Sequence, residues 1–228
     1  MHPPPWPSLL LSALLLSACV EGKPTAAASA PPPAAKAADA TPAANGECSS
    51  PESCVKAMLA AVDPLDKGAL SQAESSLRKM NRMAKGDGAK ARELLARGRA
   101  ALGKGNDPSG LDLLRQAAAA DPTDVEILDN LAIAHIRAND FAAASKAIHA
   151  GLAFDPTYAE LWNSLSLLLT VSGTKDDAVR ALLVAYGYEK DPKAALAQWE
   201  GNLGSMRGDS RQVFSTAIVK VKSAGVTR

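Results

Sequence analysis

The chain has 228 residues, which is enough for one or two domains. Its 25 Lys and Arg residues are balanced by 24 Asp and Glu residues, so the composition does not favour nucleic acid as a partner. Aromatic residues make up only 4%, and the abundance of alanine suits closely packed helices better than sheets.

Residues 1–18 are predicted to be a signal peptide. Ser8–Ala18 is an apolar run too short to span a bilayer as a stable helix. It ends in Leu16-Ser17-Ala18-Cys19, which resembles the lipobox of bacterial lipoproteins, although residues 1–7 contain no Lys or Arg. The resemblance implies cleavage before Cys19 and acylation of its sulfur and new amino group, which would anchor the chain in a membrane. Val20 follows the cysteine, and the family's sorting rule then favours an outer membrane lipoprotein facing the periplasm. The alternative to a lipobox is a chance match to its sequence within an apolar run.

Residues 19–49 are predicted to be the acylated cysteine followed by a disordered tether. Glu21–Glu47 contains Pro31-Pro32-Pro33, repeated alanine and no large apolar residue. Such a segment cannot bury enough apolar surface to become ordered. As a flexible coil it would span about 30 Å on average, which would hold a folded domain clear of a membrane surface.

Cys48 and Cys54 are the only cysteines besides Cys19. In an exported chain, two cysteines at this close spacing favour a disulfide over the alternative of two free thiols. A metal site would need more ligands than these two, and no histidine lies nearby in the sequence.

Residues 50–90 are predicted to form a helical pair. The helix beginning at Ser50-Pro51 places Val55, Met58, Leu59 and Val62 on one face, and a second apolar pattern runs from Leu70 to Met80. Asp87 precedes Asp121 by the same interval that separates Asp121 from Asp155. We therefore expect this pair to be a degenerate repeat that caps the amino-terminal end of the array of repeats in residues 91–192.

A sequence repeat organises the middle of the chain. Asp121-Pro122-Thr123 recurs as Asp155-Pro156-Thr157, and the frame gives windows at 91–124, 125–158 and 159–192. Each window reads as two helices separated by a polar break. Large apolar residues occupy the fourth position of each window: Leu94, Leu128 and Trp162. Small residues occupy the eighth position (Gly98, Ala132 and Ser166) and the twentieth position (Gly110, Ala144 and Ala178).

This pattern and its period resemble the tetratricopeptide (TPR) repeat, in which small residues let paired helices approach closely. Residues 193–228 are predicted to be a carboxyl-terminal helical pair, with Leu196, Trp199 and Leu203 on one helix and a second helix beginning at Asp209. The expected fold is all-α, a right-handed α-solenoid of TPR hairpins with degenerate capping helices at both ends. A generic helical bundle with a chance period is the alternative.

The sequence contains no recognisable catalytic motif, metal site or cofactor-binding site. His135 and His149 lie one on each helix of the central repeat, where a packing role is expected. Gly103-Lys104-Gly105 fits a turn inside the first repeat and not a phosphate-binding loop.

The resemblance implies a concave groove lined by the first helix of each repeat. One TPR subclass binds a carboxyl-terminal peptide through a basic clamp, but only Asn130 matches it, because Glu160 and Ser164 stand where basic residues are needed. The predicted groove residues are Leu95, Arg99, Leu102, Asp129, Asn130, Ile133, Arg137, Asn163, Leu167 and Val171.

The resulting functional hypothesis is a non-enzymatic, membrane-anchored scaffold or adaptor in the bacterial envelope. Its partner would be a protein whose extended or helical segment binds in the groove. One alternative is a structural or self-associating envelope lipoprotein without such a groove, in which the array forms homo-oligomers and its first-helix residues are solvated. An enzyme with an unrecognised site is the remaining alternative.

Overall fold

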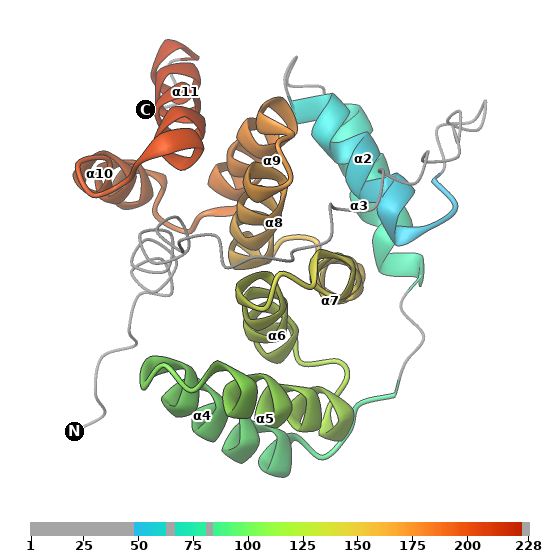
Figure 1. Ribbon diagram of the computed structural model, residues 1–228. Coiled ribbons are helices and arrows are strands. Elements are labelled where there is room, and N and C mark those ends of the chain that lie inside the picture. Colours follow the sequence, from blue (N-terminus) through green and yellow to red (C-terminus); the bar gives the residue numbers. More distant parts are fainter. Residues whose placement is uncertain (1–47, 63–66, 81–83, 225–228) are drawn as a thin grey trace.

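The computed structural model describes residues 48–62, 67–80 and 84–224. The predicted signal peptide, Cys19 and nearly all of the tether lie outside these residues. The described residues are helical apart from their turns, which confirms the predicted all-α class (Figure 1). The helices are α2 (Pro51–Val62), α3 (Lys67–Met80), α4 (Gly88–Gly103), α5 (Asp107–Ala120), α6 (Val125–Arg137), α7 (Phe141–Phe154), α8 (Ala159–Val171), α9 (Lys175–Tyr188), α10 (Pro192–Asn202) and α11 (Gly208–Ser223).

Short polar side chains determine where most of these helices begin. A side-chain oxygen at the start of the helix accepts a hydrogen bond from a backbone N–H of the first turn, which would otherwise have no partner. The residues that cap in this way are Ser50, Asp87, Asn106, Asp124, Asp140 and Asp191.

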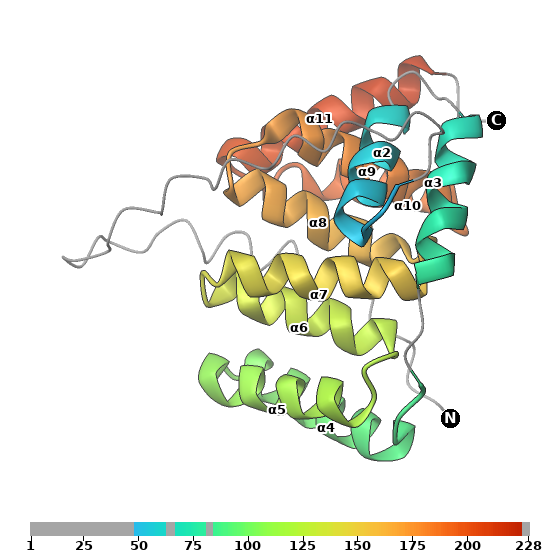
Figure 2. The same cartoon turned by 90° about the vertical axis from the view of Figure 1, so that its right-hand side faces the viewer.

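Three helix hairpins, α4–α5, α6–α7 and α8–α9, stack in sequence order (Figure 2). The two Asp-Pro-Thr turns that join them have the same geometry. Oδ1 of Asp121 accepts from the backbone N–H (3.1 Å) and hydroxyl (2.7 Å) of Thr123. Asp155 does the same with Thr157, at 3.0 and 2.6 Å. The recurring tripeptide therefore builds the same turn between successive repeats.

Small residues allow the close helix contacts. A Cβ atom added at Gly110 would lie 2.5 Å from Cδ2 of Leu102, and one added at Gly98 would lie 3.0 Å from Cγ of Leu114. A side chain at either position would have to displace a leucine packed between α4 and α5, so packing favours glycine at both.

The amino-terminal pair α2–α3 does not stack on α4 as a cap. Its main contacts with the repeats are with α7 and α9, which are the second helices of the second and third repeats (Figure 2). Met58 of α2 and Leu77 of α3 are fully buried in the same apolar cluster as Ile148 and Leu152 of α7. This corrects the expected position of the cap.

A difference in surface chemistry explains this position. The exposed side of α4–α5 already carries polar pairs, such as Arg97 with Glu93 at 3.4 Å and Gln116 with Asp112 at 2.7 Å. The apolar surface of α7–α9 would be exposed to water without α2 and α3. Burial of apolar area therefore favours the observed position of the pair.

A disulfide joins Cys48 to Cys54, with their Cα atoms 5.0 Å apart. Cys54 lies on α2 and is fully buried, whereas Cys48 is partly buried. The bond therefore ties Cys48, three residues before the start of α2, to the apolar cluster that holds this helix.

At the carboxyl-terminal end, α11 takes the place of a further first helix. It packs mainly on α9 and less on α8. In the same way, α8 packs more on α7 than on α6 of the preceding repeat. The associated core cluster centres on Trp199 of α10, whose ring lies 5.7 Å from those of both Tyr186 and Phe214. Within the described residues, no helix is long and apolar enough to cross a membrane.

Candidate partner-binding surface

The first helices α4, α6 and α8 lie side by side, and we call the surface that they form the first-helix face. It contains all ten residues predicted to line a groove. Four of them, Leu95, Leu102, Asp129 and Asn130, are buried in the protein itself. The accessible ones are Arg99, Ile133, Arg137, Asn163 and Leu167, together with Val171, which is 42% exposed. The structure therefore divides the predicted set into a buried part and an accessible part.

Arg99 is bound by residues of the next repeat. Its Nε donates to Oδ1 of Asn130 (3.0 Å), and its guanidinium forms an ion pair with Glu126 (2.8 Å). Nδ2 of Asn130 donates to the backbone carbonyl of Glu126 at 2.7 Å. Both ends of the Asn130 amide are thus engaged, so Asn130 is not free to hold the carboxylate of a peptide.

Arg137 is also paired within the chain. Its guanidinium binds the carboxylate of Asp107 at the start of α5, and its side chain is only 15% exposed. The two arginines that were expected to flank the groove therefore hold neighbouring repeats together, and each has its charge offset by a carboxylate.

Asp129 is 4% exposed, and its Oδ1 accepts a hydrogen bond from the hydroxyl of Ser164 on α8. Burial raises the pKa of Asp129 to about 7, and the nearby charges of Glu160 and Glu126 act in the same direction. The hydrogen bond from Ser164 and the charge of Arg99 oppose this rise. The carboxyl is therefore partly protonated near neutral pH.

Acidic groups collect around Asp129. Burial raises the pKa of the Tyr158 phenol, and the charges of Glu160, Asp129 and Glu126 raise it further. Burial and Glu160 also raise the pKa of Glu189. Glu126 and Tyr158 are not among the predicted groove residues, and Glu160 was expected only to be a departure from the basic clamp. Glu126 and Glu160 occupy the same position in successive repeats, so the repeat period could have identified them.

Asn163 has an unusual environment on this face. The residue is partly exposed, yet both polar atoms of its amide are buried and have no hydrogen-bond partner in the described part of the chain. An amide left in this state costs about 1–3 kcal/mol. Asn163 is therefore a local weak point of α8.

Burial lowers the pKa of both histidines in the central repeat. His135 is 5% exposed, and burial lowers the pKa of its imidazole, although Asp140 lies 3.3 Å from Nδ1. Nδ1 of His149 lies 2.8 Å from the backbone carbonyl of Ser145, and burial lowers the pKa of this ring too. Among the described residues, no group of three or more His, Cys, Asp or Glu side chains could hold a metal ion.

Residues 101–168 match the sequence model of the tetratricopeptide repeat family. This stretch runs from the end of α4 into α8 and contains the complete central repeat. Together with the stacked hairpins it defines an all-α, TPR-like fold. No curated protein sequence matches the chain.

The chain is similar to several solved structures, two of which are described as TPR domains. The first TPR of Spaghetti (RPAP3), bound to an HSP90 peptide, is 18% identical; the match covers 53% of this chain and 95% of that one, with a TM-score of 0.46. The Sgt2 TPR domain from Aspergillus fumigatus is 19% identical, with coverages of 64% and 87% and a TM-score of 0.46. MamA is 18% identical, with coverages of 72% and 95% and a TM-score of 0.45.

Proposed function

We propose that this protein is a non-enzymatic scaffold that binds a segment of a protein partner on its first-helix face. The observation that carries the proposal is the row of accessible apolar side chains on adjacent first helices, Ile133 on α6 with Leu167 and Val171 on α8. An extended or helical segment can bury such a row with side chains at regular spacing.

The charges beside this row determine which segment fits. Arg99 and Arg137 already have carboxylate partners. Glu126 is also paired, with Arg92 and Arg99, and Asp129 is buried, so among the described residues Glu160 is the carboxylate near this row that has no ion pair. A segment with apolar residues and a basic flank is therefore favoured, and an acidic carboxyl-terminal tail is disfavoured.

The proposal includes a lipid anchor on Cys19, with the protein attached to the outer membrane and facing the periplasm. Its support is the sequence Leu16-Ser17-Ala18-Cys19 after an apolar run, followed by the Ala- and Pro-rich residues of 21–47. Acyl chains on Cys19 would hold the protein at the membrane, and the tether would give the array freedom to reach a partner in an envelope assembly.

The binding test uses the full chain, isolated from membranes after crosslinking. Ile133→Asp and Leu167→Asp each place a charge that a bound apolar segment would have to desolvate. Each variant should reduce recovery of the partner by at least about tenfold, which corresponds to about 1.4 kcal/mol. Val219→Asp is the matched control, because Val219 is a 65% exposed apolar residue on α11, outside the first-helix face.

Unchanged recovery with both first-helix variants would overturn the proposed surface. If only copies of this chain are recovered, and Val219→Asp alone disrupts them, a self-associating protein is the correct interpretation. The anchor is tested separately by Cys19→Ala, which should move the protein out of the membrane fraction. A variant that stays in that fraction would overturn the lipid attachment and leave the binding proposal intact.

A further inference from the structure

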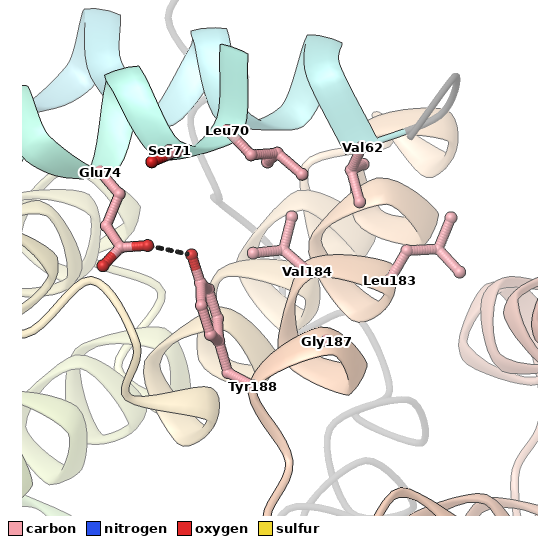
Figure 3. A pocket seen from close by; sticks show the side chains of 8 residues that line it. All are labelled: Val62, Leu70, Ser71, Glu74, Leu183, Val184, Gly187 and Tyr188. Carbon is pink, nitrogen blue, oxygen red and sulfur yellow. Dashed lines mark hydrogen bonds between the residues drawn. The ribbon is translucent and has the colours of Figure 1, made fainter. Parts of the chain in front are cut away.

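A cavity of about 290 Å³ lies between the α2–α3 pair and α9, and none of its lining residues belongs to α4, α6 or α8 (Figure 3). Its walls are apolar. Val62 and Leu70 line it from the α2–α3 pair, and Leu183 and Val184 line it from α9. At about 30 Å³ for each water-sized group, the cavity has room for about ten non-hydrogen atoms.

One end of the cavity is polar. The Tyr188 hydroxyl donates to Oε2 of Glu74 at 3.0 Å, as the dashed line in Figure 3 shows. The other oxygen of Glu74 accepts from Arg78 of the same helix at 3.1 Å. Ser71, one turn before Glu74, lines the same end. The Glu74 side chain is 26% exposed, so a ligand's polar group can reach its carboxylate.

This polar end has an excess of negative charge. Arg78 is the cation that bonds to Glu74, and it also lies 3.9 Å from the carboxylate of Asp155. Burial raises the pKa of the Tyr188 phenol, and the charge of Glu74 raises it further, so the phenol stays neutral. Among the side chains that the structure describes, two carboxylates thus face one guanidinium, and a cationic group is the complementary ligand.

Gly187 lines the cavity from α9. This residue is exposed and helical, and a Cβ atom added there would have no atom within 4 Å. A larger side chain at this position would therefore occupy the free space without displacing the protein.

We propose that the cavity is a binding site for a small aliphatic amine, with its chain between α3 and α9 and its ammonium at Glu74. The chain replaces water against four apolar side chains, and the ammonium can donate to Glu74 and Ser71. A cavity of this kind, apolar with a few polar groups at one end, is typical of small-molecule sites.

A second cavity, of about 300 Å³, lies between α2 and α7–α8, and it serves as an internal control. Its lining includes both Glu52 and Lys56, so it has no comparable excess of negative charge. His149 also lines it, and its backbone signal should not move when the amine binds at Glu74.

The experiment titrates the full chain with octylamine, 1-octanol and octanoate, and follows backbone amide signals by NMR. Signals of Glu74, Leu183 and Tyr188 should shift. Octylamine should bind about fivefold more tightly than octanoate, because a partly exposed charge contributes at most about that much. Glu74→Gln keeps an oxygen for Tyr188 but should abolish the preference for the amine over the alcohol.

Gly187→Leu should weaken binding of both octylamine and 1-octanol at least about tenfold. Gly201→Leu is the matched control: Gly201 is also an exposed helical glycine with no atom near an added Cβ, but it lies on α10. Helix content by circular dichroism should be unchanged in both. Equal binding by wild type and Gly187→Leu, or octanoate binding as tightly as octylamine, would overturn the proposal.

Discussion

Ser164 of α8 donates a hydrogen bond to the buried carboxyl of Asp129 on α6, and so joins the first helices of two successive repeats. The bond lies beneath the first-helix face. Glu126 and Glu160 belong to the same two helices and act on the same carboxyl. The carboxyl of Asp129, whose protonation changes near neutral pH, therefore lies beneath the surface proposed to bind a partner.

Asp129→Asn should make stability less dependent on pH. Burial raises the pKa of Asp129 from an ordinary 3.8 to about 7 in the folded chain. Between these two values the folded state holds a proton that the unfolded state releases, so stability falls as pH rises and the loss is complete above about pH 7. The Asn variant keeps an oxygen for Ser164 and should be about 1–3 kcal/mol more stable than wild type at pH 8.

Urea unfolding of the two proteins at a series of pH values measures this effect. At pH 4 their free energies of unfolding should nearly coincide. Asp112→Asn is the control, since Asp112 is exposed and should show no comparable trend. A difference between Asp129→Asn and wild type that stays constant from pH 4 to pH 8 would contradict the assigned shift.

Ile148→Ala should destabilise the array by about 2–5 kcal/mol, because this side chain of α7 is fully buried. Leu131→Ala should cost less within that range, since Leu131 is 9% exposed. Val219→Ala, at a 65% exposed position, should stay within about 0.5 kcal/mol. Denaturant unfolding checks all three. A cost for Ile148→Ala no larger than that for Val219→Ala would mean that α7 is misplaced.

Met58→Ala tests the position of the α2–α3 pair. Met58 is fully buried against the array, so its truncation should cost about 2–5 kcal/mol. Because α2 packs on α7 and α9, amide hydrogen exchange should accelerate in those helices before it does in α4 and α5. Earlier loss of protection in α4 would instead support a cap stacked on the first repeat.

Reducing the Cys48–Cys54 disulfide should lower stability by about 2 kcal/mol, since the closed loop is short. Urea unfolding with and without a reductant measures this change while both side chains remain in place. In the reduced folded protein, Cys48 should react with an alkylating agent much faster than Cys54, because Cys54 is fully buried. Equal rates at the two thiols would show that the start of α2 has detached.

Local features of the sequence determined the helices and the repeat. Apolar spacing and capping residues such as Asp124 and Asp140 act within a few positions, so they can be identified without knowing the fold. The recurrence of Asp121 as Asp155, one repeat later, likewise located the turns between hairpins. These interactions are short in sequence, which is why the pattern predicted them.

The groove was predictable only in part. Repeat positions located Ile133 and Leu167 on the correct helices, but no pattern within one repeat indicates that Arg99 binds Glu126 and Asn130. That network depends on which side chains meet once the repeats stack. The same holds for Asp129, whose raised pKa is a consequence of burial between α6 and α8.

The position of the α2–α3 pair was decided by tertiary structure alone. The apolar face with Val55 and Met58 predicted that the pair must pack against something, and the spacing of Asp87 from Asp121 suggested the nearest repeat. Apolar burial is non-directional and favours whichever surface would otherwise remain in water. The α4–α5 hairpin carries polar pairs on its exterior, whereas α7 and α9 contribute apolar residues such as Ile148, Leu152 and Val184 to the cluster that includes the pair, and so the pair lies across α7 and α9.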